Sequence, residues 1–174
     1  ANDDRAVFPR PSVGKLTLDL NEANTAITIT PVGVGNLDYP VSGFVRIGSE
    51  VCAFTRTGDD LTLVRGEGGT DASSHSVGDT VQLCAWFDGE TVQDIVYDLI
   101  TIGARISPTY IDKGEWDEEQ AAYLPRLYSA LITAPTGVSK LIAELAEQVG
   151  FFMFWDEVAE KIIFKSIRPN SGTD

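Results

Sequence analysis

The residues best able to do chemistry in this sequence are one histidine and two cysteines. His75 lies beside a serine in the segment 71–78, but adjacency does not make a catalytic triad, because its three members must converge in space. Cys52 and Cys84 lie in apolar, strand-like segments, which favours two small buried thiols over a disulfide between them. These residues are also too few for a structural zinc site. We expect neither a metal nor a cofactor.

A glycine-rich segment, Arg65-Gly-Glu-Gly-Gly-Thr70, is the next candidate. A phosphate-binding loop would end in Gly-Lys-Ser/Thr and would precede a helix, whereas this segment lies between two strand-like runs. Glu67 within the segment and Asp71 directly after it would also repel a phosphate. The segment therefore predicts a wide turn shaped by its backbone.

An acidic run could suggest carboxylate chemistry, and its members are Asp112, Glu115, Asp117, Glu118 and Glu119. A glycoside hydrolase needs two carboxyl groups that face each other across a cleft, which a contiguous run rarely supplies. The spacing of a calcium-binding loop is absent. Because acids are stabilised near the start of a helix, we interpret the run as a helix N-terminus, and we expect no enzyme active site.

The first half of the chain alternates between apolar and polar residues, with turn residues between the runs. This period of two predicts β-strands. Six short strands are expected, at 16–20, 26–30, 43–47, 50–55, 61–64 and 80–86. Gly48-Ser49 and Gly58–Asp60 favour tight hairpin turns. We expect a small antiparallel β-barrel or sandwich.

The second half changes to a period of 3.6 residues, which predicts helices. Thr91 and Asp94 have the spacing of a capping box, and Gly103 favours a left-handed helix stop. Another helix is expected to begin near Pro135 and to close at Gly150.

Two further elements complete this half. Glu118–Leu131 has the pattern of a helix that Pro125 would disturb. Strands at 151–155 and 161–165 predict a hairpin on which the helices pack, so this half is expected to be α+β. The expected organisation is an extended segment at 1–14, a β domain at 15–87, an α+β domain at 88–168 and a polar tail at 169–174.

Aromatic residues are concentrated in the first strand of this hairpin. Phe151, Phe152, Phe154 and Trp155 place apolar side chains on both of its faces, because successive side chains alternate. One face can pack on the helices, which leaves the other for a second layer or for another chain. The candidate interface residues are Phe152, Phe154, Trp155 and, within the acidic run, Trp116.

The overall composition limits the classes of partner that the protein can bind. Of the 174 residues, 43% are hydrophobic, and 26 acidic against 13 basic side chains give a formal charge of −13. The apolar share is typical of a folded protein, and the acidity argues against tight binding of nucleic acid. No run approaches the ~20 apolar residues of a membrane-spanning helix, and the first residues do not have the pattern of a signal peptide.

Residues 43–55 and 61–81 resemble a segment that recurs in tail proteins of tailed bacteriophages. There, an Ile-x-Glu strand is followed by a Leu-Thr-Val strand, an Arg-Gly-x-x-Gly-Thr turn, an Ala-x-x-His and a glycine before the next strand. The matching positions here are Arg65, Gly66, Gly69, Thr70, Ala72, His75 and Gly78. The resemblance implies that they determine the shape of the turn and are not catalytic.

Residues 92–167 are similar to tail-tip and baseplate-hub proteins of such phages. The features that carry this similarity are a leading helix, Tyr110-Ile111, Trp116, Ala134-Pro135, a Leu-Ile-x-Glu-Leu helix and Trp155-Asp156. The resemblance implies a structural subunit at the distal end of the tail, part of the virion and assembled in the host cytoplasm. Hub proteins of this kind form a ring that joins the tail tube to a spike or fibres, which implies other tail proteins as partners and a homo-oligomeric ring.

Two other functions are open on the sequence. A receptor- or glycan-binding module of the tail tip would stack sugars on Trp116 or on the nearby tyrosines. A cell-wall hydrolase would depend on acids such as Glu115 and Asp117. The hub or tail-tip subunit is the function that we expect.

Overall fold

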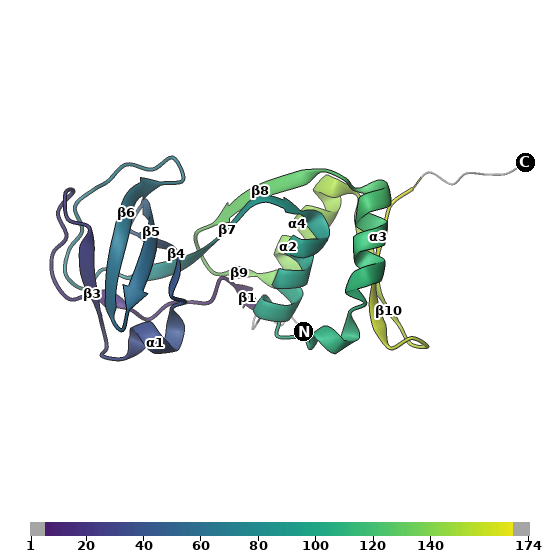
Figure 1. The fold of residues 1–174 in the computed structure, drawn as a ribbon, viewed down its shortest axis with the longest axis horizontal. Helices are drawn as coiled ribbons and strands as arrows, with labels where there is room; N and C mark the ends of the chain where they lie inside the picture. Colours follow the sequence, from purple (N-terminus) through teal and green to yellow (C-terminus); the bar gives the residue numbers. More distant parts are fainter. Residues whose placement is uncertain (1–5, 169–174) are drawn as a thin grey trace, which may run out of the picture. The chain divides into compact units, whose positions relative to one another are not determined.

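The structure is a computed structural model that describes residues 6–168, and it divides into two compact units (Figure 1). The sheet unit comprises Pro9–Trp86 and Ala130–Pro135, and the helical unit comprises the other described residues. The expected polar tail at 169–174 lies outside the described residues, as do residues 1–5 of the expected extended segment. The division after Trp86 lies beside the expected junction, but the chain returns to the sheet unit at 130–135.

The protein is a β-rich α+β fold, and its largest sheet is antiparallel with the order β2-β3-β6-β5-β4-β7-β8. Its strands are β2 (Lys15–Leu16), β3 (Ala26–Thr30), β4 (Ser42–Ile47), β5 (Glu50–Thr57), β6 (Asp60–Glu67), β7 (Val81–Thr91) and β8 (Leu127–Ile132). The sequence predicts either a barrel or a sandwich for the first half, and this sheet does not form a barrel. The strand expected at 16–20 is only β2, and its bridge from Lys15 to Thr80 beside β7 stays isolated instead of extending into a ladder.

The period of two correctly predicts which side chains of the sheet are buried. Ile27 and Ile29 of β3 are buried while their neighbours are exposed. The two expected hairpin turns are confirmed between β4 and β5 and between β5 and β6, with positive φ at Gly48 (58°) and Gly58 (60°). A short helix, α1 (Val34–Asp38), follows β3. The core of the unit comprises Leu16, Leu20, Ile27, Ile29, Val34, Tyr39, Val45, Ile47, Cys52, Phe54, Leu61, Leu63 and Val81.

The helical unit contains short and long elements in the order β1 (Val7–Phe8), α2 (Val92–Asp98), η1 (Leu99–Gly103), η2 (Pro108–Tyr110), α3 (Lys113–Tyr123), β9 (Thr136–Gly137), α4 (Val138–Val149), β10 (Phe151–Asp156) and β11 (Lys161–Ser166). The predicted N-cap at Thr91 is confirmed, because its hydroxyl accepts a hydrogen bond from the backbone N–H of Asp94. The reciprocal half of the capping box is not formed, since the Asp94 carboxylate accepts from the Thr91 hydroxyl and not from its backbone N–H. Helix α2 continues into the π-helical turn η1, which ends at Gly103 as expected, but Gly103 is not among the residues with positive φ, so the expected left-handed conformation is wrong. A Cβ at Gly103 would lie 2.8 Å from Cγ2 of Val138, so glycine is needed there for close packing.

The helix expected over 118–131 has the wrong bounds. Helix α3 begins earlier, because the Asp112 carboxylate accepts a hydrogen bond from the backbone N–H of Glu115 and caps it. It ends at Tyr123, since Pro125 disfavours helical angles at the residue before it. The residues that follow form β8 beside β7. The acidic run therefore does mark a helix N-terminus, as the sequence predicts.

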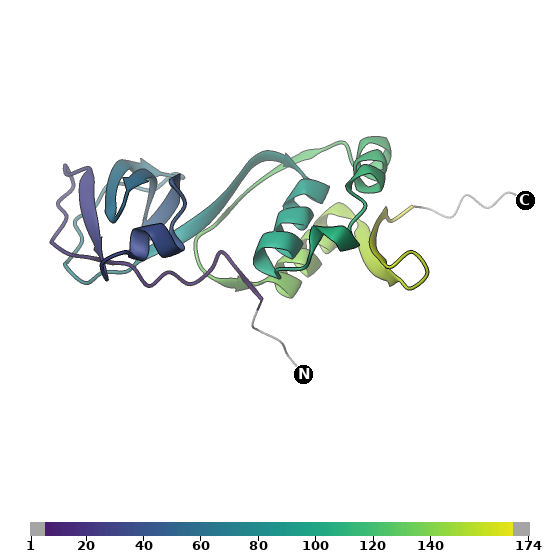
Figure 2. The same ribbon diagram turned by 60° about the horizontal axis from the view of Figure 1, so that its bottom comes forward.

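The last helix and the hairpin follow the predicted order. Helix α4 begins at Val138, a little later than expected near Pro135, because Thr136 and Gly137 pair with β1. It closes at Gly150 with a left-handed φ of 85°, as predicted. The two views in Figures 1 and 2 place α3 beside the β10–β11 hairpin. The core of this unit comprises Val92, Val96, Ile100, Ile111, Trp116, Phe151 and Phe164. No helix in the described part of the chain is long and apolar enough to cross a membrane.

Candidate functional site

The β10–β11 hairpin has one buried face and one exposed aromatic face. Phe151 and Phe164 are 2% and 1% exposed, and their ring centroids lie 4.9 Å apart in the core. Phe152 and Phe154 point to the other side, are each 46% exposed, and stack with their centroids 6.0 Å apart. We call these two phenylalanines the outer aromatic face. Its apolar side chains have no covering element among the described residues.

Trp155 forms a second exposed aromatic group at the far end of β10. It is 48% exposed, and its ring meets the edge of Tyr110 at 5.7 Å between centroids. Tyr110 is itself 45% exposed. Because Trp155 follows the alternation of Phe151 and not that of Phe154, it does not belong to the outer aromatic face.

Trp116, the fourth candidate interface residue, lies in the core instead of on the surface. It is 1% exposed, its indole N–H donates to the carbonyl of Ile162 at 3.0 Å, and its ring lies 5.4 Å from that of Phe164. The reason is its place on the side of α3 that packs against β11. Trp116 therefore cannot contact a partner or stack on a sugar in this structure.

The acidic residues around Trp116 are used in capping and ion pairs. Lys113 holds two carboxylates, with its Nζ atom 2.7 Å from Asp94 and 2.6 Å from Asp117. Asp117 also accepts a hydrogen bond from the amide of Gln93 at 2.7 Å. Glu115, the other acid that a hydrolase would need, is exposed in the first turn of α3. No group of three or more potential metal ligands is present among the described residues.

The motif residues of the sheet unit converge on a carboxylate that sequence reasoning missed. Glu50 is fully buried, and Arg65 contacts both of its oxygens, with Nε 2.6 Å from Oε1 and Nη2 2.7 Å from Oε2. His75 places Nε2 2.8 Å from Oε2. The backbone N–H groups of Gly66 and Ser73 donate to the same carboxylate at 3.2 and 3.0 Å. We call Glu50, Arg65 and His75 the Glu50 cluster.

The Glu50 cluster also binds two loops to the sheet through hydrogen bonds from Arg65. Arg65 donates to the backbone carbonyls of Asn21, Asn24 and Ser73 at 2.9, 2.7 and 2.6 Å. The guanidinium group has five N–H donors, so it can bind a carboxylate and several carbonyls at the same time. The loops at 21–24 and 68–80 are thereby held against β5 and β6.

Opposing effects set the charge of Glu50. Burial alone would raise the pKa of this carboxyl, but the hydrogen bonds from Arg65, His75 and the Ser73 backbone outweigh burial and hold its pKa far below the usual range. Burial and the neighbouring Glu50 carboxylate raise the pKa of the Cys52 thiol to about 12, and burial raises that of Cys84 to about 11. Both cysteines are free thiols, but only Cys52 is buried as expected, since Cys84 is partly exposed. Their raised pKa values disfavour the reactive thiolate.

The remaining motif residues shape the turn. Thr70 accepts a hydrogen bond from the backbone N–H of Val51 at 3.0 Å and donates to the carbonyl of Glu67 at 2.7 Å. Gly66, Gly69 and Gly78 have φ values of 69°, 78° and 89°, which favour glycine. Thr70 therefore holds the turn by hydrogen bonds, and the three glycines provide its backbone angles.

A second buried carboxylate, Glu119 of α3, was also missed. It is 6% exposed and accepts hydrogen bonds from the backbone and hydroxyl of Ser166 at 2.9 and 2.7 Å. Arg168 contacts both of its oxygens at 2.6 and 2.7 Å and lies over the ring of Tyr123. Burial would raise the pKa of Glu119, but these partners lower it from 4.5 to about 2.

Sequence spacing carries a signal for both missed carboxylates. Glu50, Cys52 and Phe54 share one face of β5 under the period of two, so Glu50 is expected on the same side as two apolar residues. Glu119 follows Trp116 by three residues on α3, which places them on one face of a helix. A charged residue on an apolar face indicates a buried partner elsewhere in the chain.

The low pKa of Glu119 makes the helical unit sensitive to acid. A carboxyl group whose pKa is lower in the folded state stabilises the fold above the unfolded-state pKa, and this contribution is lost as the pH falls through the folded-state pKa. For Glu119 this window runs from about 4.5 down to about 2. We expect Glu119→Gln to lose at most about 3 kcal/mol at neutral pH and to approach the wild-type stability near the lower limit.

Urea unfolding followed by the helical circular dichroism signal at several pH values checks this. Glu144→Gln is the matched control, because Glu144 is exposed and lies 3.8 Å from Lys140 in a surface pair, which contributes little. A stability difference between wild type and Glu119→Gln that does not change with pH would contradict the assignment.

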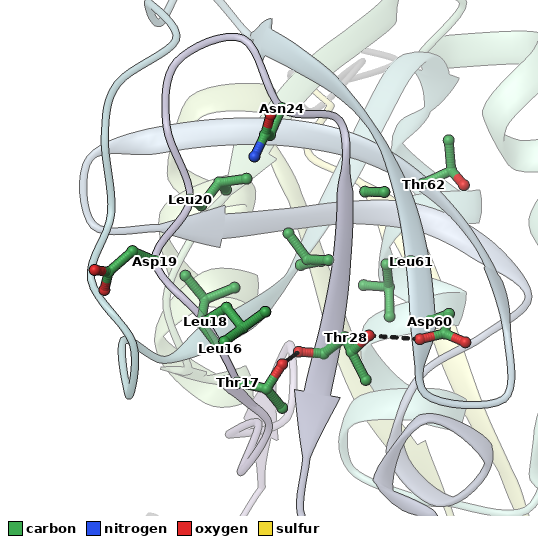
Figure 3. A pocket seen from close by; sticks show the side chains of 12 residues that line it. Leu16, Thr17, Leu18, Asp19, Leu20, Asn24, Thr28, Asp60, Leu61 and Thr62 are labelled. Atoms are coloured by element: carbon green, nitrogen blue, oxygen red, sulfur yellow. Dashed lines mark hydrogen bonds between the residues drawn. The ribbon is translucent and has the colours of Figure 1, made fainter.

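A shallow hollow of about 250 Å³ lies beside β3 and β6 in the sheet unit (Figure 3). Leu16, Leu18 and Leu61 contribute apolar side chains to its lining. Its two carboxylates, Asp19 and Asp60, lie on opposite sides of it in Figure 3, and the Thr28 hydroxyl donates to Asp60 at 2.6 Å. The hollow therefore does not bring two acids together for acid–base chemistry.

No protein-family model matches the chain, and no curated protein matches it.

Proposed function

We propose that the chain is a structural component of the distal end of a bacteriophage tail, a hub or tail-tip subunit that assembles with other tail proteins. The proposal is supported by the contacts of the motif at 65–78, which resembles a segment of tail proteins. Its arginine and histidine are bound to the buried Glu50, and its threonine and glycines shape a turn. These contacts favour a motif that fixes the shape of a scaffold.

The outer aromatic face favours the same role. Phe152 and Phe154 are close to half exposed on an ordered hairpin. Exposed apolar residues that gather on one face are typical of surfaces that contact other proteins. The partners in this proposal are neighbouring tail proteins, such as tube, spike or fibre subunits.

Immunogold labelling of tailed particles from the source organism tests the proposal, with antibody raised against this chain. We expect gold at the distal tip of the tail. Tails that are intact and accessible but unlabelled, with the protein free in the lysate, would overturn it. Antibody that has first been saturated with the purified chain serves as the specificity control, and it should leave the tails unlabelled.

A glycan- or receptor-binding role at the tail tip is a second candidate, and the exposed pair of Tyr110 and Trp155 favours it. Aromatic rings stack on sugar faces, and Trp116 is too buried to do so. Titration with host surface polysaccharide would then quench the fluorescence of Trp155. A Trp155→Phe variant that is quenched as strongly as wild type would exclude this site.

A further inference from the structure

The outer edge of β10 has unpaired main-chain groups. The backbone N–H of Ile167 donates to the carbonyl of Gly150 at 2.7 Å, and the register continues with Phe152 opposite Lys165. Because hydrogen-bonded and non-hydrogen-bonded pairs alternate in an antiparallel ladder, Phe151, Met153 and Trp155 direct their N–H and C=O groups away from β11. In the part of the chain that the structure describes, no strand pairs with this edge.

The opposite edge of the hairpin supports this assignment. Ile162 pairs with Trp155 across the hairpin, and its carbonyl accepts the indole N–H of Trp116 while a bridge joins it to Ile111. Its main-chain groups therefore point away from β10, as the alternation requires. The main-chain groups of both residues therefore point away from the hairpin, but among residues 6–168 only those of Ile162 have a partner.

The free edge is also uncharged. From Gly150 to Trp155 the chain carries no ionisable side chain, although the protein has a formal charge of −13. Two copies of so acidic a chain repel each other over most contacts. An edge without carboxylates lets them approach, and an uncharged strand edge with unpaired N–H and C=O groups is a template for another strand.

We propose that a second copy of this chain adds its β10 strand to this edge, antiparallel and about a twofold axis at Met153. Phe151 then lies opposite Trp155 of the partner subunit, and all outward N–H and C=O groups of 151–155 find partners. Asp156 falls opposite Gly150 of the partner subunit, so no like charges face each other along the contact. The two hairpins form one four-stranded sheet.

The same register joins the two outer aromatic faces. Phe152 lies opposite Phe154 of the partner subunit in a non-hydrogen-bonded pair, the arrangement that brings side chains closest together. The four phenylalanines then shield one another from water, and aromatic pairs contribute beyond the apolar area that they bury. Half-exposed rings thus acquire the neighbours that they lack in a single chain. The inference goes beyond the proposed tail function, since self-pairing can fail while tail placement holds.

Sedimentation equilibrium over a range of protein concentrations tests the self-association. We expect the wild-type chain to dimerise and Phe154→Lys to raise the dimer dissociation constant by about a hundredfold, because the change removes two aromatic contacts and places charges at the edge. Val158→Lys is the matched control: it adds the same charge to a side chain that is 96% exposed in the hairpin turn, and it should dimerise normally. A wild-type chain that stays monomeric, or a Phe154→Lys chain that dimerises equally well, would overturn the proposal.

Oxidative cross-linking tests the register without relying on a charge change. An equimolar mixture of Phe152→Cys and Phe154→Cys chains should form a disulfide-linked dimer faster than either variant alone, since only the mixture places the new thiols opposite each other. The wild-type chain, with its two native thiols, provides the background. Equal rates in the mixture and in the single variants would contradict the twofold register at Met153.

Discussion

Replacement of Arg65 by alanine is expected to destabilise the sheet unit by about 3–5 kcal/mol, because it leaves the carboxylate of Glu50 buried without its main partner. Glu50 is fully buried, and Arg65 supplies a donor to each of its oxygens. The change also removes the donors to the carbonyls of Asn21 and Asn24. A buried charge that loses its partner costs more than the pair contributed, so the loss exceeds that of a surface ion pair.

Thiol labelling during urea unfolding measures this effect in the correct unit. Cys52 and Cys84 both lie in the sheet unit, Cys52 buried and Cys84 partly buried, so the reactivity of Cys52 reports the opening of this unit and not that of the helical unit. Lys140→Ala is the control, since Lys140 is exposed and its surface pair with Glu144 contributes little. An Arg65→Ala chain whose thiols become reactive at the wild-type urea concentration would contradict the role given to the Glu50 cluster.

A double-mutant cycle separates the ion pair from the loop contacts. Glu50→Ala and Arg65→Ala should each be strongly destabilising, whereas the double variant should lose less than the sum of the two. The shortfall measures the coupling between the two side chains. The loss that remains reflects the loop carbonyls left without donors and the space left by two side chains.

Much of the fold could be predicted because its strongest signals are local. The alternation at 26–30, the hairpin turns at Gly48 and Gly58 and the caps at Thr91 and Gly150 depend on neighbouring residues only. Strand β8 was missed for the opposite reason. Its apolar residues follow Pro125 and are as compatible with a helix as with a strand. Their strand conformation depends on pairing with β7, which is far away in the sequence.

The candidate sites also combine features that local sequence predicts with features that depend on distant parts of the chain. The motif at 65–78 was recognised as a turn, but its convergence on Glu50 depends on how β5 and β6 pair, which spacing within the motif does not determine. Composition singled out the aromatic strand, and alternation explains why Phe151 and Phe152 differ in exposure. The burial of Trp116 depends on which side of α3 meets β11, and the weak apolar pattern of the acidic run does not specify this.

Replacement of Trp116 by alanine is expected to destabilise the helical unit by about 3–5 kcal/mol, because it removes a fully buried ring from the core. The ring packs on Phe164, and its N–H satisfies the carbonyl of Ile162. Trp116→Phe keeps most of the apolar volume but loses the hydrogen bond, so its cost should be nearer about 1–3 kcal/mol. Urea unfolding followed by the helical circular dichroism signal measures both, since α2, α3 and α4 lie in this unit.

Trp155→Ala is the decisive comparison, because Trp155 belongs to the same hairpin but is 48% exposed. Only about half of its side chain is covered, so its truncation should cost less than that of Trp116, about 1–2 kcal/mol. If the side chain contacts a neighbouring subunit, the same change should weaken assembly by about 2 kcal/mol or more. Equal losses of folding stability in Trp116→Ala and Trp155→Ala would mean that both tryptophans serve the core. Unchanged assembly together with unchanged unfolding in Trp155→Ala would remove Trp155 from the contact surface and leave that role to Phe152 and Phe154.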